Sequence, residues 1–247
     1  MEHAKIKSMA IVLAAGQGKR MNSQTAKQYL LLGDKPVLYY SLKAFQDSPV
    51  DEIILVTGEA ECGYVRSEIV EKYGFSKVCA VVPGGRERYH SVYNGLCEAH
   101  GRMKGQQSAH YCLIHDGARP FVTQDIIGRA LTCAVREKAC VVGMPVKDTI
   151  KIADEDGYAA GTPKRSLVWM VQTPQAFYFP LIYRAYEELV RKEEALLSQG
   201  KQITDDAGVV ELLTDVRVKM VEGSYQNIKI TTPEDLKIAE TFLLTLF

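Results

Sequence analysis

The hydrophobic pattern of this chain alternates between short branched apolar runs and longer stretches with helical spacing. Runs that are apolar throughout indicate strands buried on both faces. They predict five strands, at residues 11–13, 51–57, 77–82, 110–115 and 140–144. Apolar residues spaced three and four apart predict helices between them, over 36–45, 59–73, about 92–99 and 123–138. Strands that alternate with helices predict an α/β fold, a Rossmann-like, mostly parallel sheet with helices on both faces.

This alternation stops between residues 145 and 172. Residues 146–152 and 166–171 look extended, and turn-forming residues at 154–157 separate them. A two-stranded excursion from a compact sheet buries too little surface to stand alone. We therefore expect a protruding β-arm at about 145–172 that packs against a second copy of the chain, which makes the protein a homodimer.

Regular order resumes after the arm. The pattern predicts helices over 180–197 and 204–213, strands over 216–221 and 225–230, and a last helix opened by Thr232 and Pro233. No repeat or linker divides the sequence. We expect one domain over 1–247, from which the arm projects.

Composition narrows the class of partner. Thirty Lys and Arg residues balance thirty Asp and Glu residues, so the formal net charge is zero. A nucleic-acid or membrane partner is therefore not expected, and any anion site must be local. No apolar run is long enough for a membrane span, the N-terminus has no signal-peptide core, and the six cysteines lack metal-ligand spacing. These features predict a cytoplasmic protein with reduced thiols.

The first strand runs into the candidate phosphate site. Small residues and glycines occupy most of 14–18, and three cations follow, Lys19, Arg20 and Lys27. Small residues let a ligand approach the backbone, and a loop rich in positive charge can hold a polyphosphate. The dinucleotide fingerprint would need a third glycine where Met21 stands, and a P-loop would need Ser or Thr where Arg20 stands. A nicotinamide oxidoreductase is therefore disfavoured.

Eight motifs then occur in order, and together they resemble the 2-C-methyl-D-erythritol 4-phosphate cytidylyltransferase family. They are Leu13-Ala14-Ala15-Gly16, Lys27-Gln28-Tyr29, Pro83-Gly84-Gly85, His115-Asp116-Gly117-Ala118-Arg119-Pro120, Val146-Lys147-Asp148-Thr149, Gln172-Thr173-Pro174-Gln175, Thr204-Asp205-Asp206-Ala207 and Asn227-Ile228-Lys229. The resemblance covers almost the whole chain. Ribitol-5-phosphate cytidylyltransferases are the nearest alternative. They more usually have two glycines after one alanine in the first motif and Val before the Arg of the aspartate loop.

The resemblance implies a nucleotide-diphospho-sugar transferase type of fold and transfer of a cytidylyl group from CTP to a polyol phosphate. Arg20 and Lys27 would stabilise the transition state. The polyol phosphate would be bound by Arg165, Lys229, Thr149, Arg119 and Thr204. The nucleotide would be bound by Ala14, Ala15, Gly16, Gly18, Gly84, Gly85, Ser91 and Asp116. Mg²⁺ or another divalent cation would bind at Asp116 and Asp205.

Simpler interpretations compete with several of these assignments. Ser91 can be an ordinary hydroxyl near a helix start, Asp205 can cap its helix, and His115 is more often a packed core histidine than an acid–base group. Arg165 and Thr149 lie in the arm, so they can serve the neighbouring subunit's site. A non-catalytic nucleotide-binding protein on the same fold is a further alternative. It is disfavoured because such a protein would be expected to lose Arg20, Lys27 or Asp116.

Overall fold

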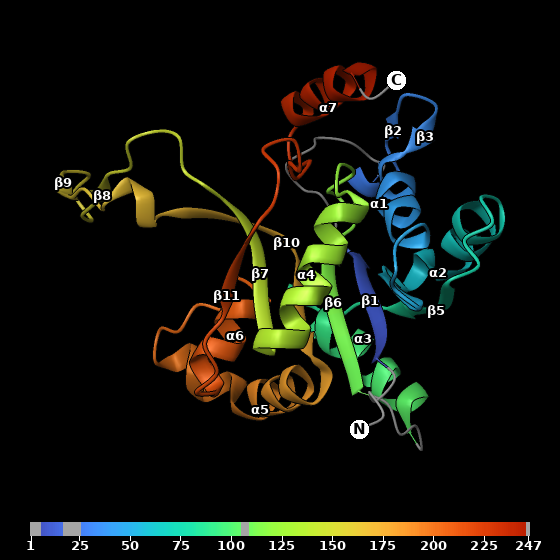
Figure 1. The fold of residues 1–247 in the computed structure, drawn as a ribbon, viewed down its shortest axis with the longest axis horizontal. Helices are drawn as coiled ribbons and strands as arrows, with labels where there is room; N and C mark the ends of the chain where they lie inside the picture. Colours follow the sequence, from blue (N-terminus) through green and yellow to red (C-terminus); the bar gives the residue numbers. More distant parts are fainter. Residues whose placement is uncertain (1–5, 17–25, 105–108, 246–247) are drawn as a thin grey trace.

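The computed structural model describes residues 6–16, 26–104 and 109–245, and its main feature is a seven-stranded sheet (Figure 1). The strand order is β11-β7-β10-β6-β1-β4-β5. The strands are β1 (Ile6–Ala14), β4 (Glu52–Thr57), β5 (Val78–Pro83), β6 (Ala109–Asp116), β7 (Ala139–Pro145), β10 (Trp169–Tyr178) and β11 (Lys219–Glu222). The five strands expected before the arm are all present.

One strand breaks the parallel arrangement. β10 lies between β6 and β7 and pairs antiparallel with both, while β1, β4, β5 and β6 pair parallel, as do β7 and β11. A strand that returns directly to its neighbour without a crossover helix runs antiparallel to it. β10 returns from the arm in this way, so a mostly parallel sheet is correct.

Helices cover both faces of the sheet (Figure 1). On one face, α1 (Val37–Gln46) and α4 (Gln124–Glu137) contribute Phe45 and Ile127 to a buried apolar cluster. On the other, α3 (Arg88–Met103), α5 (Phe179–Ser198) and α6 (Asp206–Leu213) form a second cluster around Tyr186. None of the described helices is long and apolar enough to cross a membrane.

A smaller cluster holds the C-terminal helix. α7 (Pro233–Thr245) packs near the hairpin of β2 (Leu31–Leu32) and β3 (Lys35–Pro36). Leu32, Phe121 and Ile230 are buried in this cluster. This cluster packs the segment that follows Lys27 against the C-terminal helix α7.

The helical stretch expected at 59–73 is present but irregular. It consists of η3 (Glu59–Glu61), α2 (Cys62–Tyr64) and η4 (Val65–Glu71), which is π-helical. Its buried side chains are Val65 and Ile69, which lie four residues apart and pack toward the sheet. The prediction of a helix at 59–73 is therefore confirmed, but the sequence did not show its change from 3-10 to α and then to π geometry.

The strand predicted at 225–230 is wrong. The segment makes no ladder; instead Ile230 N donates to Ala118 O at 2.9 Å, and Asn227 Nδ2 donates to Thr173 O at 3.0 Å. These bonds run to loops at the carboxyl edge of the sheet, so the segment crosses that edge as irregular chain. The preceding strand is β11, shorter than the 216–221 expected.

The arm protrudes from the body of the molecule (Figure 1). The extended stretch expected at 146–152 is mostly irregular, because strand pairing is limited to β8 (Ile152–Ala153) and β9 (Ala159–Gly161). η5 (Arg165–Leu167) replaces the start of the extended stretch expected at 166–171. Tyr158 and Leu167, two large apolar side chains of the arm, are each 75% exposed.

Candidate active site

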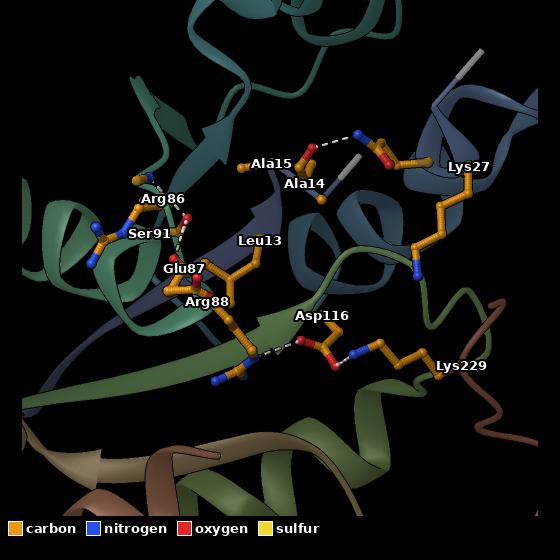
Figure 2. A pocket seen from close by; sticks show the side chains of 14 residues that line it. Leu13, Ala14, Ala15, Lys27, Arg86, Glu87, Arg88, Ser91, Asp116 and Lys229 are labelled. Atoms are coloured by element: carbon orange, nitrogen blue, oxygen red, sulfur yellow. Dashed lines mark hydrogen bonds and ion pairs between the residues drawn. The ribbon is translucent and has the colours of Figure 1, made fainter. Parts of the chain in front are cut away.

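The carboxyl ends of four parallel strands meet at one edge of the sheet. Leu13 lies opposite Val56 on one side and opposite Asp116 on the other, and Thr57 lies opposite Pro83. A cavity of about 720 Å³ opens at this edge (Figure 2). It is lined by Leu13, Ala14, Ala15, Gly16, Lys27, Gln28, Gly85, Arg86, Glu87, Arg88, Ser91, Asp116, Ala118 and Lys229. Ligands of open α/β sheets bind at such edges.

Lys27 is held at the rim of the cavity by its neighbours. It starts the short helix η2 (Lys27–Tyr29), and its side chain extends toward the side of the cavity where Asp116 and Lys229 lie (Figure 2). The next residue, Gln28, is buried and donates from Nε2 to the Ala14 carbonyl at 2.6 Å. The Lys27 backbone is therefore tied directly to the end of β1. Two other predicted residues of this region, Gly18 and Arg20, lie outside the described residues.

Tyr29 makes a second tie between this segment and the sheet. Its hydroxyl lies 2.7 Å from Thr57 Oγ1 and donates to Glu61 Oε2 at 2.8 Å. Burial, and to a lesser degree the Glu61 carboxylate, raise the pKa of Tyr29 well above its ordinary value. The phenol therefore stays protonated and keeps its hydrogen bond.

The glycine turn after β5 forms the opposite wall. A Cβ on Gly84 would lie 2.4 Å from the Ala15 Cβ, so only glycine lets the two strand ends approach this closely. Gly84 N donates to Thr57 O at 2.7 Å, and Gly85 N donates to Ser91 Oγ at 3.0 Å. Ser91 therefore lines the cavity and holds the turn, and its contact with a nucleotide stays a prediction.

Asp116 stands among three cations at the end of β6. Its Oδ2 lies 2.7 Å from Lys229 Nζ and 3.9 Å from Arg119 Nε, and its Oδ1 lies 3.3 Å from Arg88 Nε. Burial alone would raise the pKa of Asp116, but Arg88, Lys229 and Arg119 together hold it well below its ordinary value. The carboxylate is therefore ionised throughout the physiological pH range.

Arg88 also pairs with a second carboxylate that the sequence reasoning missed. Its Nη1 and Nη2 donate to Asp206 Oδ1 and Oδ2 at 2.9 and 2.8 Å, and the Tyr186 hydroxyl donates to the same carboxylate at 2.5 Å. Asp206 and Tyr186 are fully buried. Arg88 follows the Gly84-Gly85 motif and Asp206 lies in the Thr204–Ala207 motif, but they are 118 residues apart, and no local pattern pairs them.

Two predicted residues near α6 lie away from the cavity lining. Thr204 is exposed, and Asp205 is the N-cap of α6, where its Oδ1 accepts from Gly208 N at 3.0 Å. The other Asp205 oxygen accepts from Gln175 Nε2 at 2.9 Å. Because both oxygens hold structural partners, the capping interpretation of Asp205 describes the structure and its predicted metal role has no geometric support.

The arm carries two further predicted residues. Thr149 and Arg165 are exposed, neither lines the cavity of its own chain, and Arg165 donates from Nη1 to Lys147 O at 3.3 Å. Arg119 is not in the lining either, but it lies directly behind it: its Nη1 donates to Asn227 O at 2.7 Å, which fixes the chain just before Lys229. Lys229 thus reaches the cavity from the irregular segment that the sequence had assigned to a strand.

The donor groups of the described residues limit how a metal could bind. No cluster of three or more His, Cys, Asp or Glu side chains suited to a metal ion exists in this part of the chain. Asp116 and Glu87 are the carboxylates of the described cavity lining, and one or two carboxylates suit Mg²⁺ when substrate phosphates and waters complete the coordination. The residues present therefore fit a metal carried by a polyphosphate, and do not form an all-protein site.

His115 is a core residue, as expected. It is fully buried, its Nδ1 lies 2.9 Å from Thr173 Oγ1, and its Nε2 lies 3.3 Å from Arg119 O. Burial lowers the pKa of His115 to about 3. Its imidazole is therefore neutral at physiological pH and helps to hold the strand end that carries Asp116.

Comparisons with known proteins agree with this geometry. The family model described as 2-C-methyl-D-erythritol 4-phosphate cytidylyltransferase matches residues 8–245. The protein of that name from Lachnoclostridium phytofermentans is 51% identical over 237 residues, which are 96% of this chain and 96% of the relative. The protein of that name from Caldanaerobacter subterraneus is 46% identical over 235 residues, 95% of this chain and 97% of the relative.

Solved structures show the same likeness. The crystal structure of 4-diphosphocytidyl-2C-methyl-D-erythritol synthase from Anaerococcus prevotii superimposes with a TM-score of 0.80 at 35% identity, covering 96% of each chain. That of 2-C-methyl-D-erythritol 4-phosphate cytidylyltransferase from Thermus thermophilus has a TM-score of 0.71 at 29% identity, covering 95% of this chain and 98% of the other. This chain therefore belongs to the 2-C-methyl-D-erythritol 4-phosphate cytidylyltransferase family.

Proposed function

We propose that this protein transfers a cytidylyl group from CTP to 2-C-methyl-D-erythritol 4-phosphate, in isoprenoid precursor biosynthesis. A phosphate oxygen of the polyol phosphate attacks the α-phosphorus of CTP, the bond to the bridging oxygen breaks, and pyrophosphate leaves with the electron pair. The products are 4-diphosphocytidyl-2-C-methyl-D-erythritol and pyrophosphate. The observation that carries this proposal is the cavity where Lys27, Lys229 and Arg88 gather at the carboxyl edge of the sheet.

Catalysis of this kind depends on positioning and on charge stabilisation more than on covalent chemistry. Two polyanions must meet while negative charge develops at the α-phosphate. Lys27 and Lys229 extend from the same side of the cavity toward Asp116 (Figure 2), so a phosphate bound there would meet both cations. A pair of unit charges at 4 Å is worth about 1 kcal/mol in water but about 4 kcal/mol at an effective dielectric of 20. Exclusion of water from the cavity therefore strengthens both contacts. Arg20 is proposed to act with Lys27, as the family resemblance implies.

The nucleotide base is proposed to lie against the wall formed by Ala14–Gly16 and the Gly84-Gly85 turn. Gly84 approaches Ala15 so closely that a Cβ on it would clash, and a purine is proposed to crowd this wall where a pyrimidine fits. Backbone groups there and the Ser91 hydroxyl can bond the amino group and carbonyl of cytosine. Gly18 is assigned to nucleotide binding by resemblance.

Mg²⁺ or another divalent cation is proposed as the cofactor, held by the triphosphate together with Asp116. When bound, the cation neutralises phosphate charge. Lys229 and Arg88 already occupy the two Asp116 oxygens at 2.7 and 3.3 Å, so Lys229 would turn from the carboxylate to a phosphate as substrate enters. Asp205 is left out of this assignment because its oxygens hold α6 and Gln175.

The arm is proposed to pair two subunits. The exposed Tyr158 and Leu167 supply apolar surface for a second chain, and Arg165 and Thr149 would then grip the polyol phosphate in the partner's cavity. Arg suits a phosphate because its fork donates two parallel hydrogen bonds. Sedimentation at micromolar concentration is expected to give a dimer, and Leu167→Asp to give a monomer. A monomeric wild-type protein would refute this part.

The protein is also proposed to be cytoplasmic, because its six free thiols suit a reducing compartment.

The test is a paired substrate assay. Purified protein is incubated with CTP and either 2-C-methyl-D-erythritol 4-phosphate or ribitol 5-phosphate, with and without Mg²⁺, and pyrophosphate release is measured. Release with the erythritol ester in the presence of Mg²⁺ is expected. Faster release with the ribitol ester would assign the alternative polyol. A folded protein that releases pyrophosphate with neither ester would instead indicate a non-catalytic nucleotide-binding protein.

A further inference from the structure

The guanidinium of Arg88 joins two carboxylates that have different surroundings. Its Nη1 and Nη2 grip Asp206 at 2.9 and 2.8 Å, and its Nε points the other way to Asp116 Oδ1 at 3.3 Å (Figure 2). Asp206 is fully buried, while Asp116 lines the cavity. Arg88 therefore links the interior of the protein to the cavity wall.

The interior half of this link is rigid. Asp206 lies in the first turn of α6, where the helix dipole favours a negative charge, and the buried Tyr186 on α5 donates to the same carboxylate. A bidentate arginine–carboxylate pair fixes both the distance and the plane of the guanidinium. Because Asp206 on α6 holds both Nη atoms, and Tyr186 on α5 holds Asp206, Arg88 cannot move toward an incoming phosphate without breaking two buried contacts.

Lys229 differs from Arg88 in this respect. Its Nζ lies 2.7 Å from Asp116 Oδ2, and its long side chain is 35% exposed. An entering phosphate can compete for Lys229 without disturbing the interior. When this happens, Arg88 still holds Oδ1, while Thr173 Oγ1 accepts from the Asp116 backbone N–H at 3.1 Å.

From this contrast we infer that Arg88 is a positioning residue that, anchored by Asp206, fixes the Asp116 carboxylate so that Oδ2 faces Lys229 and the cavity. This inference deepens the proposed function and rests on it for its kinetic test. It assigns separate tasks to the cations around Asp116. Arg88 stays in place through the reaction cycle, and Lys229 exchanges between the carboxylate and substrate phosphate.

The test compares variants that leave no single buried charge behind. Arg88→Gln alone would strand the buried Asp206 carboxylate and endanger folding. The double variant Arg88→Gln/Asp206→Asn removes both charges and leaves two neutral amides. Arg102→Gln is the matched control, because it removes a guanidinium from the same helix, α3, far from the cavity lining. Melting curves establish that each variant is folded.

Turnover is then measured in two backgrounds. In the otherwise wild-type protein, the double variant is expected to lower kcat/KM by about 10- to 100-fold, the cost of a misplaced active-site group. In an Asp116→Asn background, the same two substitutions are expected to lower it by less than about threefold, because Arg88 acts through that carboxylate. A folding defect would lower activity by the same factor in both backgrounds. Equal losses, or a double variant as fast as wild type, would overturn the inference.

Crystal structures of the wild type and the double variant give a readout independent of activity. We expect the Asp116 carboxylate to rotate and the contact of its Oδ2 with Lys229 Nζ to be lost in the variant. An unmoved carboxylate would also overturn the inference. This structural comparison decides the role of Arg88 where the turnover of Asp116→Asn is too low to detect. If wild-type protein releases no pyrophosphate with either polyol ester, the proposed function fails, while the crystallographic comparison still decides the role of Arg88.

Discussion

Asp205 and Asp206 are adjacent residues of the same type, yet the structure predicts very different costs for replacing them by alanine. Asp205 caps α6 from a partly exposed position and also accepts from Gln175. Asp206 is fully buried and holds both Nη atoms of Arg88 and the Tyr186 hydroxyl. We compare Asp206→Ala with Asp205→Ala as its matched control.

The contacts set the magnitudes. Removing one partner of a buried ion pair costs about 3–5 kcal/mol, because it leaves the other charge uncompensated. Arg88 retains Asp116, which limits this loss, but the buried Tyr186 hydroxyl also loses its acceptor, a cost of about 1–3 kcal/mol that overlaps with the first. We expect a total of about 3–5 kcal/mol for Asp206→Ala. Loss of the Asp205 cap costs about 1 kcal/mol.

Thermal unfolding followed by calorimetry at neutral pH distinguishes the two. For a chain of this size, 1 kcal/mol shifts Tm by about 2–4 °C. Asp206→Ala is therefore expected to lower Tm by about 6–20 °C, and Asp205→Ala by about 2–4 °C. Equal shifts for the two variants, or a larger one for Asp205→Ala, would refute the claim that the buried contacts of Asp206 contribute more stability than the Asp205 cap.

Three further predictions concern the cavity and the buried His115 next to it. Lys27→Ala is expected to lower kcat for pyrophosphate release by on the order of 10²–10³ with an unchanged melting curve, as loss of a preorganised charge does, and wild-type turnover would exclude Lys27 from the mechanism. Gly84→Ala is expected to cost about 1–3 kcal/mol in urea unfolding and to weaken CTP binding in titration calorimetry, because its Cβ would lie 2.4 Å from that of Ala15. Unaltered affinity and stability would show that the strand ends can separate freely. The pKa of His115 falls to about 3 in the folded state, below its unfolded value near 6.5, so its contribution is complete above pH 6.5 and is lost as pH falls from there toward 3. Urea unfolding of wild type and His115→Gln across this window should show a steeper acid loss for wild type, and parallel curves would contradict the assignment.

The local hydrophobic pattern determined most of the fold. Periods of two and of about 3.6 residues are properties of short segments, so the strands at 11–13 and 110–115 and the helix at 123–138 could be located from the sequence. Parallel order followed because strand–helix alternation admits few other arrangements. The glycine turn and the cation Lys27 could be placed near one cavity by the rule that strand ends share an edge.

Tertiary structure alone decided how distant segments pair. β10 lies antiparallel in the middle of the sheet because it returns from the arm without a crossover helix. Residues 225–230 have a strand-like pattern, but they hydrogen-bond to loops at the sheet edge, so they carry Lys229 into the cavity as irregular chain.

The same distinction separates the two carboxylates of the Thr204–Ala207 motif. The sequence could not show that Asp205 caps α6. It also could not show that Asp206 is the buried partner of Arg88, because the two residues are 118 positions apart. Local periodicity reports which face of a segment avoids water, and the sequence therefore determined the elements and their order. The partner of each buried charge depends on contacts between segments far apart in the chain, and only the folded structure decided them.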